Sequence, residues 1–349
     1  MHIFFLGYPG AMGGANTECW HTAKVWRQHG IEVTFIPTWQ PGAMLPRLEA
    51  IGCKTVVAGG PDGLRDVPGF AGSVVVAMCN NTAVKQRKLL KDLGCRLVWV
   101  NCMTFLIGDE PVAFRQGGPA EAYVFQSEFQ RDELEKLLIP LGYNHGMGHL
   151  IRGAFAFEEV PFAPRPHGAP GTCGSGEDFW IGRLSRPDVD KWSSNHWPIL
   201  ARVPYARRRA LAMGWSPQLT AKCGPPPPWA EALEPQRIPV VEFLGRCHAL
   251  VGLNGGAREN WPRVGLEAMA AGVPLVVQDQ WGWREMIVDG QTGFLTNGDE
   301  EMAYRLAQLA YDEDLRVAIV ERARSAVRDL ACPQRIGKQW ARLLAGLGA

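Results

Sequence analysis

Short apolar runs recur along the first part of the chain, and a turn and a helix-length segment follow each of them. Residues 2–7, 32–37 and 73–81 contain such runs. Apolar runs without polar alternation are typical of strands that are buried on both faces of a parallel sheet. Parallel strands need crossover connections, which are right-handed in nearly all proteins. We therefore expect an α/β fold whose first domain is Rossmann-like, with five to six strands.

A proline- and glycine-rich stretch without hydrophobic period divides the chain at residues 163–177. Such stretches are typical of linkers. A length of 349 residues is sufficient for about two domains. We expect an N-terminal Rossmann-like domain over 1–162 and a second one over 178–332. Pro333 then sets apart a final helix over 333–349.

Composition and charge exclude several classes of function. The formal net charge of +1 provides no overall positive potential that would attract nucleic acid. Nine cysteines occur without a Cys-x-x-Cys pair or zinc spacing, so we expect reduced thiols, no metal and a cytoplasmic protein. No apolar run reaches the roughly 18 residues of a membrane span, and the N-terminus lacks the charged start of a signal peptide.

The one tight basic run is 207–209, three consecutive arginines. We interpret it as a solvated helix face. The alternative is contact with an anionic membrane or with the phosphate of an acceptor, which would place the protein peripherally at the inner membrane face.

Gly13 and Gly14 open the turn after the first apolar run, with Asn16 or Thr17 as cap of the following helix. Glycines let backbone amides approach a ligand closely, and ligands of open α/β sheets bind at the carboxyl ends of strands. We therefore count both glycines as candidate donor-binding residues. The pattern is not Gly-x-Gly-x-x-Gly, which argues against a dinucleotide site.

Polar residues follow two other expected strands. Asn80 comes after 73–79, and Asn101 and Cys102 come after 95–100. They are candidates for the acceptor side of a site, or they simply cap and turn the chain; the residues alone leave both open. His145 and His149 lie in a glycine-rich loop, and we interpret them as structural.

The stretch 259–290 carries the strongest functional signal. Residues from Pro262 to Ala271 favour a helix, with Gly272 as its stop. Glu267 lies inside this otherwise apolar run, and an unpaired buried charge costs several kcal/mol. Either Glu267 occupies a wet stripe of the helix, or it accepts hydrogen bonds from ligand hydroxyls. The helix N-terminus beside it suits a phosphate.

The spacing Glu-x7-Glu from Glu259 to Glu267 is followed by AMAAGVPLVV, by Glu285 after an aromatic loop, and by DGQTGFL. This arrangement resembles the retaining nucleotide-sugar glycosyltransferases of family 4, which have the GT-B fold. The resemblance implies two Rossmann-like domains facing each other across a cleft, with the acceptor on the first and the donor on the second. It also implies that helix 333–349 crosses back to the first domain.

The resemblance assigns the neutralisation of the donor diphosphate to Arg183 and Lys191, and a diphosphate leaving group needs fixed positive charge. Lys191 follows Arg183 by eight residues rather than the family's five, which leaves Arg186 as a substitute. The pattern Asp188-x-Asp190 could hold a divalent metal, but we interpret it as a capping or solvated turn. We expect no metal and no cofactor.

By the same resemblance Glu259 holds sugar hydroxyls and Glu267 holds ribose hydroxyls. The backbone amides of Arg263, Val264 and Gly265 face the phosphate or the sugar. The sequence departs from the family in two places. Trp261–Pro262 stands where the family has Phe-Gly, and the proline removes one backbone amide donor. Residues 101–104 stand where the family has a loop with a histidine near the reacting sugar.

The resulting expectation is a retaining glycosyltransferase that uses a front-face mechanism, with a glycan, glycolipid or small molecule as acceptor. No general base is assigned. The alternatives are a non-catalytic or partner-subunit protein that binds a sugar nucleotide, and a nucleotide-sugar 2-epimerase. A dehydrogenase lacks its glycine fingerprint. The sequence does not decide the base, the sugar or the acceptor.

Overall fold

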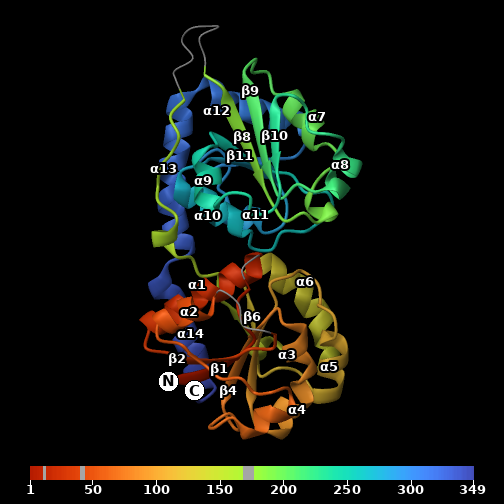
Figure 1. Cartoon of the computed structure of the whole chain (residues 1–349), viewed down its shortest axis with the longest axis vertical. Coiled ribbons are helices and arrows are strands. Elements are labelled where there is room, and N and C mark those ends of the chain that lie inside the picture. The colour runs from red at the N-terminus through yellow and green to blue at the C-terminus, as the bar shows by residue number, and fades with distance from the viewer. Residues whose placement is uncertain (11–12, 40–43, 168–176) are drawn as a thin grey trace. The chain divides into compact units, whose positions relative to one another are not determined.

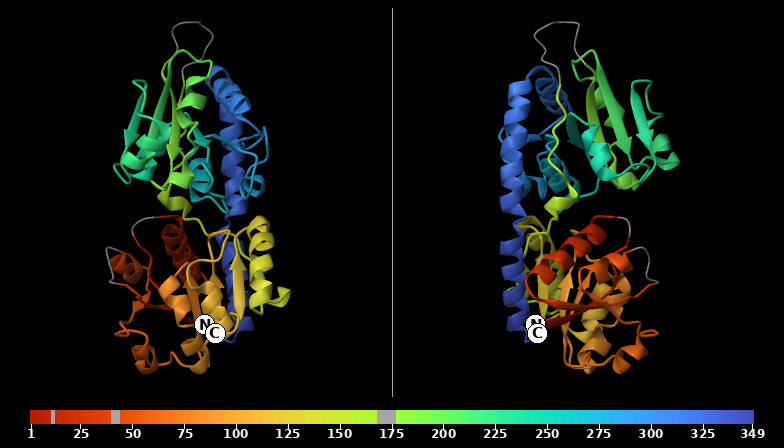
Figure 2. Two further views of the ribbon diagram at one scale, coloured as in Figure 1. Left: turned by 90° about the vertical axis from the view of Figure 1, so that its right-hand side faces the viewer. Right: turned by 60° about the vertical axis from the view of Figure 1, so that its left-hand side comes forward.

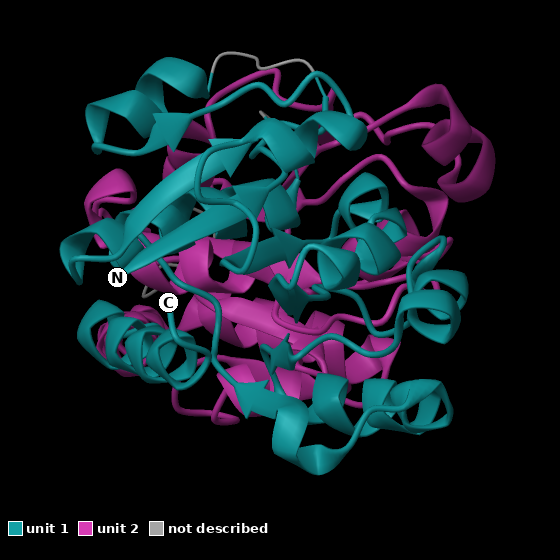
Figure 3. Cartoon of the chain, turned by 90° about the horizontal axis from the view of Figure 1, so that it is seen from below, with its two compact units in different colours: residues 1–156, 331–349 teal, residues 157–330 magenta. Residues whose placement is uncertain are grey.

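The computed structural model describes residues 1–10, 13–39, 44–167 and 177–349. The chain divides into two compact units (Figure 3). Unit 1 comprises residues 1–156 and 331–349, and unit 2 comprises residues 157–330. Of the expected linker 163–177, residues 168–176 lie outside the described residues, and 163–167 belong to unit 2.

In the described part of unit 1, seven parallel strands form one sheet in the order β3-β2-β1-β4-β5-β6-β7 (Figure 1). The inner strands are buried along most of their length, as their apolar sequences predict. The strands are β1 (His2–Leu6), β2 (Glu32–Ile36), β3 (Lys54–Thr55), β4 (Val74–Met78), β5 (Arg96–Val100), β6 (Ala122–Phe125) and β7 (Gly148–Leu150).

Helices connect these strands, and the last helix of the chain returns to unit 1. Trp340 of α14 packs edge-to-face on Trp26 of α1, with ring centroids 5.0 Å apart. Both chain termini lie side by side in this unit (Figure 2). The helices are α1 (Gly14–Gln28), α2 (Leu45–Ala50), α3 (Asn81–Lys85), α4 (Arg87–Asp92), α5 (Glu110–Gly117), α6 (Glu128–Leu138) and α14 (Pro333–Gly346).

The start of α1 differs from the expectation. The residue ahead of the helix is Gly13, with φ +98°, and the expected caps Asn16 and Thr17 lie inside the first turn. The Asn16 side chain instead accepts a hydrogen bond from the amide of Gly10 at 2.7 Å. Residues inside the first turn cannot be the N-cap of the helix, so the cap prediction was wrong.

In the described part of unit 2, six parallel strands form a second sheet in the order β10-β9-β8-β11-β12-β13. This order places β8 and β11 side by side at its centre. The strands are β8 (Phe179–Leu184), β9 (Arg208–Met213), β10 (Ala230–Leu233), β11 (Ala249–Gly252), β12 (Leu275–Gln278) and β13 (Phe294–Thr296).

The core of unit 2 contains three buried tryptophans, Trp192, Trp197 and Trp215, packed against the strand residues. No helix in the described residues is long and apolar enough to cross a membrane. The helices are α7 (His196–Ala201), α8 (Pro217–Cys223), α9 (Val240–Gly245), α10 (Arg263–Ala271), α11 (Trp283–Met286), α12 (Asp299–Tyr311) and α13 (Glu313–Leu330).

Candidate functional site

Four polar side chains gather at the carboxyl ends of β8 and β11. Because these parallel strands are neighbours, the loops that follow them meet at one edge of the sheet, which is where ligands of open α/β sheets bind. Arg183 lies near the end of β8, and Lys191 ends a short 3-10 turn after it. Asn254 and Glu259 lie in the loop after β11.

Lys191 and Glu259 form an ion pair across the two loops. The Lys191 Nζ lies 2.9 Å from the Glu259 Oε1, and the side chains are 18% and 14% exposed. Asn254 supports the pair, because its Nδ2 donates to the same Glu259 oxygen at 3.0 Å and to the Ala257 carbonyl at 2.9 Å. The pair is therefore held in place and still reaches solvent.

Arg183 lies beneath this pair, with only 2% of the residue exposed. Its Nη2 donates to the Lys191 carbonyl at 2.6 Å and to the Asn254 Oδ1 at 2.8 Å. Burial lowers the pKa of Arg183 to about 10, and the charge of Glu259 opposes that shift. The direct diphosphate contact implied for Arg183 would require the guanidinium to leave these partners. As the side chain lies, it supports Lys191 and Asn254 from below.

A buried histidine next to Arg183 stays neutral. His196 packs on Trp192 and Trp197, and burial together with the Arg183 charge lowers the pKa of His196 to about 3. Arg183 therefore remains the positive charge beneath the site.

The Asp188-x-Asp190 turn serves structural partners. The Asp188 carboxylate forms an ion pair with Arg186 at 3.1 Å, and the backbone carbonyl of Asp190 accepts from the amides of Gly255 and Ala257 at 2.9 Å each. No group of three or more side chains suited to a metal ion occurs in the part of the chain that the structure describes. Arg186, the expected substitute for Lys191, is thus engaged with Asp188.

Helix α10 begins after Pro262 and ends at Gly272, which adopts φ +84°, as the sequence predicted for its stop. Among the expected amide donors, Gly265 donates its N–H to the Pro262 carbonyl at 2.9 Å. A side chain at Gly265 would collide with Met286 and Trp283, so close packing accounts for this glycine. The first turn residues Arg263 and Val264 are buried and half-buried.

Glu267 lies one turn further along α10 and is half-buried. Burial raises the pKa of Glu267, and the nearby Arg263 cation opposes that shift. Within the described ranges, no residue donates a hydrogen bond to this carboxylate or pairs with it. A desolvated acceptor without a protein donor is typical of a group that meets a ligand.

The unit 1 candidates are occupied with local structure. Gly13 precedes α1 and its carbonyl accepts from the amides of Asn16 and Thr17 at 3.1 Å each, while Gly14 is the first helical residue. Asn80 caps α3 by accepting from the Ala83 amide at 2.9 Å.

Asn101 has partners within its own loop, and Cys102 has a partner at the end of the neighbouring strand β4. The Asn101 side chain donates to the Phe105 carbonyl at 2.9 Å and accepts from the Met103 amide at 2.7 Å. The Cys102 amide donates to the Cys79 sulfur at 2.8 Å. These contacts hold both residues as parts of the turn after β5.

Two residues of these sites escaped the sequence analysis. Asn254 follows the run HALVGL directly, and its position at a strand exit was the available signal. Glu110 begins α5 and is fully buried; its carboxylate accepts from Trp99 Nε1, the Ile107 amide and Asn101 Nδ2. Burial raises the pKa of Glu110 to about 7 against these hydrogen bonds. A lone glutamate before a proline gave no signal for this network.

The two histidines that we interpreted as structural lie at the end of unit 1. His145 is exposed, and its Nδ1 lies 3.1 Å from the Glu135 carboxylate. His149 belongs to the edge strand β7, and burial lowers its pKa.

Two Rossmann-like units with parallel sheets define a GT-B fold, and solved glycosyltransferases share it across nearly the whole chain. Anabaena Alr3699/HepE in complex with UDP-glucose aligns with a TM-score of 0.75 and 19% identity, covering 99% of this chain and 100% of that one. Sucrose-phosphate synthase (tll1590) from Thermosynechococcus elongatus aligns at 0.73 and 14%, covering 99% and 98%. A glycosyltransferase from Rickettsia africae ESF-5 aligns at 0.72 and 14%, with the same coverage.

A sequence family also matches part of unit 2. Residues 235–326 match the family described as "Glycosyl transferases group 1", and this segment contains Asn254, Glu259, α10 and Glu267. A comparison with functionally curated sequences finds no match. The fold is therefore GT-B, and residues 235–326 of unit 2 are similar to the glycosyl transferases group 1 family.

Proposed function

We propose that this protein is a glycosyltransferase that moves a sugar from a nucleotide-sugar donor to an acceptor hydroxyl. The observation that carries the proposal is Glu267, a desolvated carboxylate without a protein donor, on a helix of the glycosyl transferases group 1 domain. Ribose presents two neighbouring hydroxyls, and a carboxylate can accept from both.

In the proposed complex, Lys191 neutralises the diphosphate and Glu259 binds sugar hydroxyls. A lysine ammonium has three donors, so Lys191 can keep its 2.9 Å contact with Glu259 while it donates to a phosphate oxygen. Fixed positive charge at a developing diphosphate stabilises the transition state. The Arg183 charge beneath Lys191 adds to that field without a direct contact.

We further propose that transfer proceeds with retention at the front face and without a resident metal, and that unit 1 binds the acceptor. In this scheme the leaving diphosphate oxygen takes the proton of the acceptor hydroxyl, and the protein supplies positioning and charge. The Anabaena neighbour was solved with UDP-glucose and with UDP and glucose. These complexes support a nucleotide-sugar donor and make UDP-glucose the first donor to test.

The test is calorimetric binding followed by a transfer assay over UDP-, GDP-, ADP- and TDP-sugars. We expect one donor to bind to the wild type and to release its nucleoside diphosphate in the presence of an acceptor. Glu267→Gln should lose donor binding. Wild-type affinity in that variant would contradict the ribose assignment.

A second candidate is a non-catalytic protein that binds a sugar nucleotide. The observation in its favour concerns Asn101 and Cys102, where the family carries a histidine loop. Asn101 is held by Met103 and Phe105 of the same loop, and Cys102 is held by Cys79 after β4. Donor binding without turnover for any acceptor class would favour it over the enzyme.

A further inference from the structure

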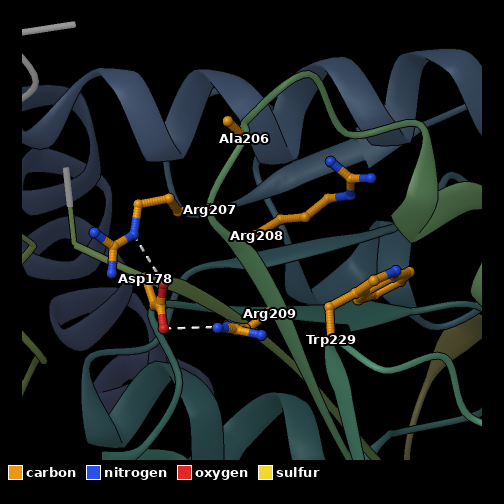
Figure 4. Close-up of a pocket in the computed structure, with 6 residues that line it drawn as sticks. All are labelled: Asp178, Ala206, Arg207, Arg208, Arg209 and Trp229. Atoms are coloured by element: carbon orange, nitrogen blue, oxygen red, sulfur yellow. Dashed lines mark hydrogen bonds and ion pairs between the residues drawn. The ribbon is translucent and has the colours of Figure 1, made fainter. Parts of the chain in front are cut away.

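A cavity of unit 2 lies at the opposite edge of the sheet from the candidate donor site. It has a volume of about 320 Å³. Asp178 and Arg207 immediately precede β8 and β9, so the cavity lies at the amino ends of these strands. A strand of six residues separates it from the Arg183 end by roughly 20 Å. The lining residues are Asp178, Ala206, Arg207, Arg208, Arg209 and Trp229 (Figure 4).

One carboxylate holds two of the arginines. Arg207 and Arg209 approach Asp178 from two sides, and their Nε atoms donate to its two oxygens at 3.0 and 3.1 Å (Figure 4). Burial opposes the ionisation of Asp178, but the two arginines outweigh it and lower the pKa of Asp178. The Asp178 carboxylate is therefore ionised at neutral pH, and its ion pairs hold both guanidinium groups in place.

The Nη groups of these two arginines remain available. Each bridge uses an Nε atom, and among the described residues none accepts from the Nη atoms of Arg207 or Arg209. The two side chains are 55% and 41% exposed. Guanidinium Nη groups bind phosphate oxygens in a two-pronged geometry with short, strong hydrogen bonds.

The third arginine, Arg208, lies next to an aromatic ring. Arg208 points away from Asp178 (Figure 4), and its guanidinium carbon lies 5.5 Å from the centroid of the Trp229 ring. Its Nη1 donates to the Tyr205 carbonyl at 3.2 Å. The half-buried Trp229 thus brings an apolar ring face into a cationic cavity.

The lining carries three guanidinium groups and one carboxylate, so an anion is favoured, and a volume near 300 Å³ is at the lower end for small-molecule sites. We propose that this cavity is a binding site for a phosphate-bearing ligand, separate from the donor site. Arg207 and Arg209 hold the phosphate, and Trp229 packs on the group that carries it. The phosphate belongs either to a small soluble phosphoester or to a phospholipid headgroup.

The experiment measures phosphate binding with the donor site weakened. Inorganic pyrophosphate is titrated by calorimetry into protein carrying Lys191→Gln, alone and combined with Arg207→Gln/Arg209→Gln. We expect the arginine pair to weaken pyrophosphate binding about tenfold or more, because charge-assisted hydrogen bonds are lost. The matched control Arg115→Gln/Arg237→Gln removes two exposed arginines outside the cavity and should leave the affinity unchanged.

Vesicle co-sedimentation separates the two sources of phosphate. Wild-type protein is sedimented with phosphatidylglycerol or phosphatidylcholine vesicles, beside the Arg207→Gln/Arg209→Gln variant. Binding to the anionic vesicles that the variant loses identifies a lipid headgroup. Pyrophosphate binding without vesicle binding identifies a soluble phosphoester.

Equal affinity of the arginine variant and the control, for pyrophosphate and for vesicles, would overturn the proposal. Thermal unfolding checks that the variant is folded after Asp178 loses its partners. If it is not, the single variant Arg207→Gln decides, because it removes one of the two proposed phosphate donors and leaves the bridge from Arg209 to Asp178 intact. An unchanged pyrophosphate affinity in that variant would equally refute the site.

Discussion

The ammonium of Lys191 and the carboxylate of Glu259 meet at 2.9 Å, although the two residues belong to loops after different strands. Arg183 joins the same two loops from below, through the Lys191 carbonyl and the Asn254 side chain. The ion pair and the buried guanidinium thus tie the loop after β8 to the loop after β11. Substitutions of Lys191 and Arg183 therefore test different parts of this arrangement.

Lys191→Gln should weaken UDP-glucose binding about tenfold or more, because a charge-assisted contact with the diphosphate is lost. The protein should remain folded, since Asn254 still donates to Glu259. Calorimetry measures the affinity. Lys136→Gln breaks an exposed lysine–glutamate pair of unit 1 and is the matched control. If Lys136→Gln weakened UDP-glucose binding as much as Lys191→Gln, the assignment of Lys191 to the diphosphate would be refuted.

Glu267→Gln should abolish nucleotide binding without loss of stability. The pKa of Glu267 is raised in the fold, so its ionised form disfavours folding above the ordinary carboxyl pKa. As the pH rises above about 4.5, the free energy of unfolding of the wild type should therefore fall relative to that of the variant. Urea unfolding at several pH values measures this difference. Glu242→Gln, an exposed change on α9, should show neither effect.

Arg183→Gln should lower the free energy of unfolding by about 2–4 kcal/mol, because the Lys191 carbonyl and Asn254 Oδ1 lose their buried donor. Turnover should fall with it, whereas binding of the free nucleoside should change little. Chemical denaturation measures the stability. A variant with unchanged stability and lost diphosphate affinity would show that Arg183 contacts the donor directly.

Glu110→Gln should change how the stability depends on pH. Burial raises the pKa of Glu110 to about 7. The contribution of the protonated Glu110 carboxyl to the free energy of unfolding is therefore fully present below about pH 4.5 and is lost as the pH rises through 7. Relative to the variant, wild-type stability should fall by about 3 kcal/mol across this window. Glu321→Gln, at an exposed position of α13, is the control. Parallel pH profiles of stability for wild type and Glu110→Gln would contradict the raised pKa of Glu110.

Transfer activity, once a donor is found, should survive a chelator. Lys191 supplies the positive charge at the proposed diphosphate position, and the Asp188 carboxylate is paired with Arg186. Activity is compared before and after treatment with excess EDTA. Loss of activity that magnesium restores would revive the metal interpretation of Asp188 and Asp190.

The sequence predicted the two parallel sheets because strands buried on both faces need uninterrupted apolar runs, and β1 and β4 have them. The helix-length segment that follows the run 73–81 forms two helices in the structure, because Gln86 leaves the helical conformation. Apolar periodicity continues across such a break and cannot reveal it.

The candidate site was predictable only where its groups are close in sequence. The positions of Glu259 and Glu267 around α10 follow from local spacing. The surroundings of buried Arg183 do not follow from local spacing, because its partner Asn254 lies at the exit of another strand. The partners of Glu110 likewise come from β5 and the loop after it. Tertiary contacts of this kind leave no local pattern.

The packing of Trp340 on Trp26 has a consequence for the synthesis of the protein. Residues 331–349, which complete unit 1, are translated after all of unit 2. Domains commonly fold as units while the chain emerges. Unit 1 can therefore begin to fold early, while the α1 face that receives Trp340 stays uncovered until α14 is made. A ribosome that stalled before α14 would therefore carry a first half whose α1 face is still open to a chaperone.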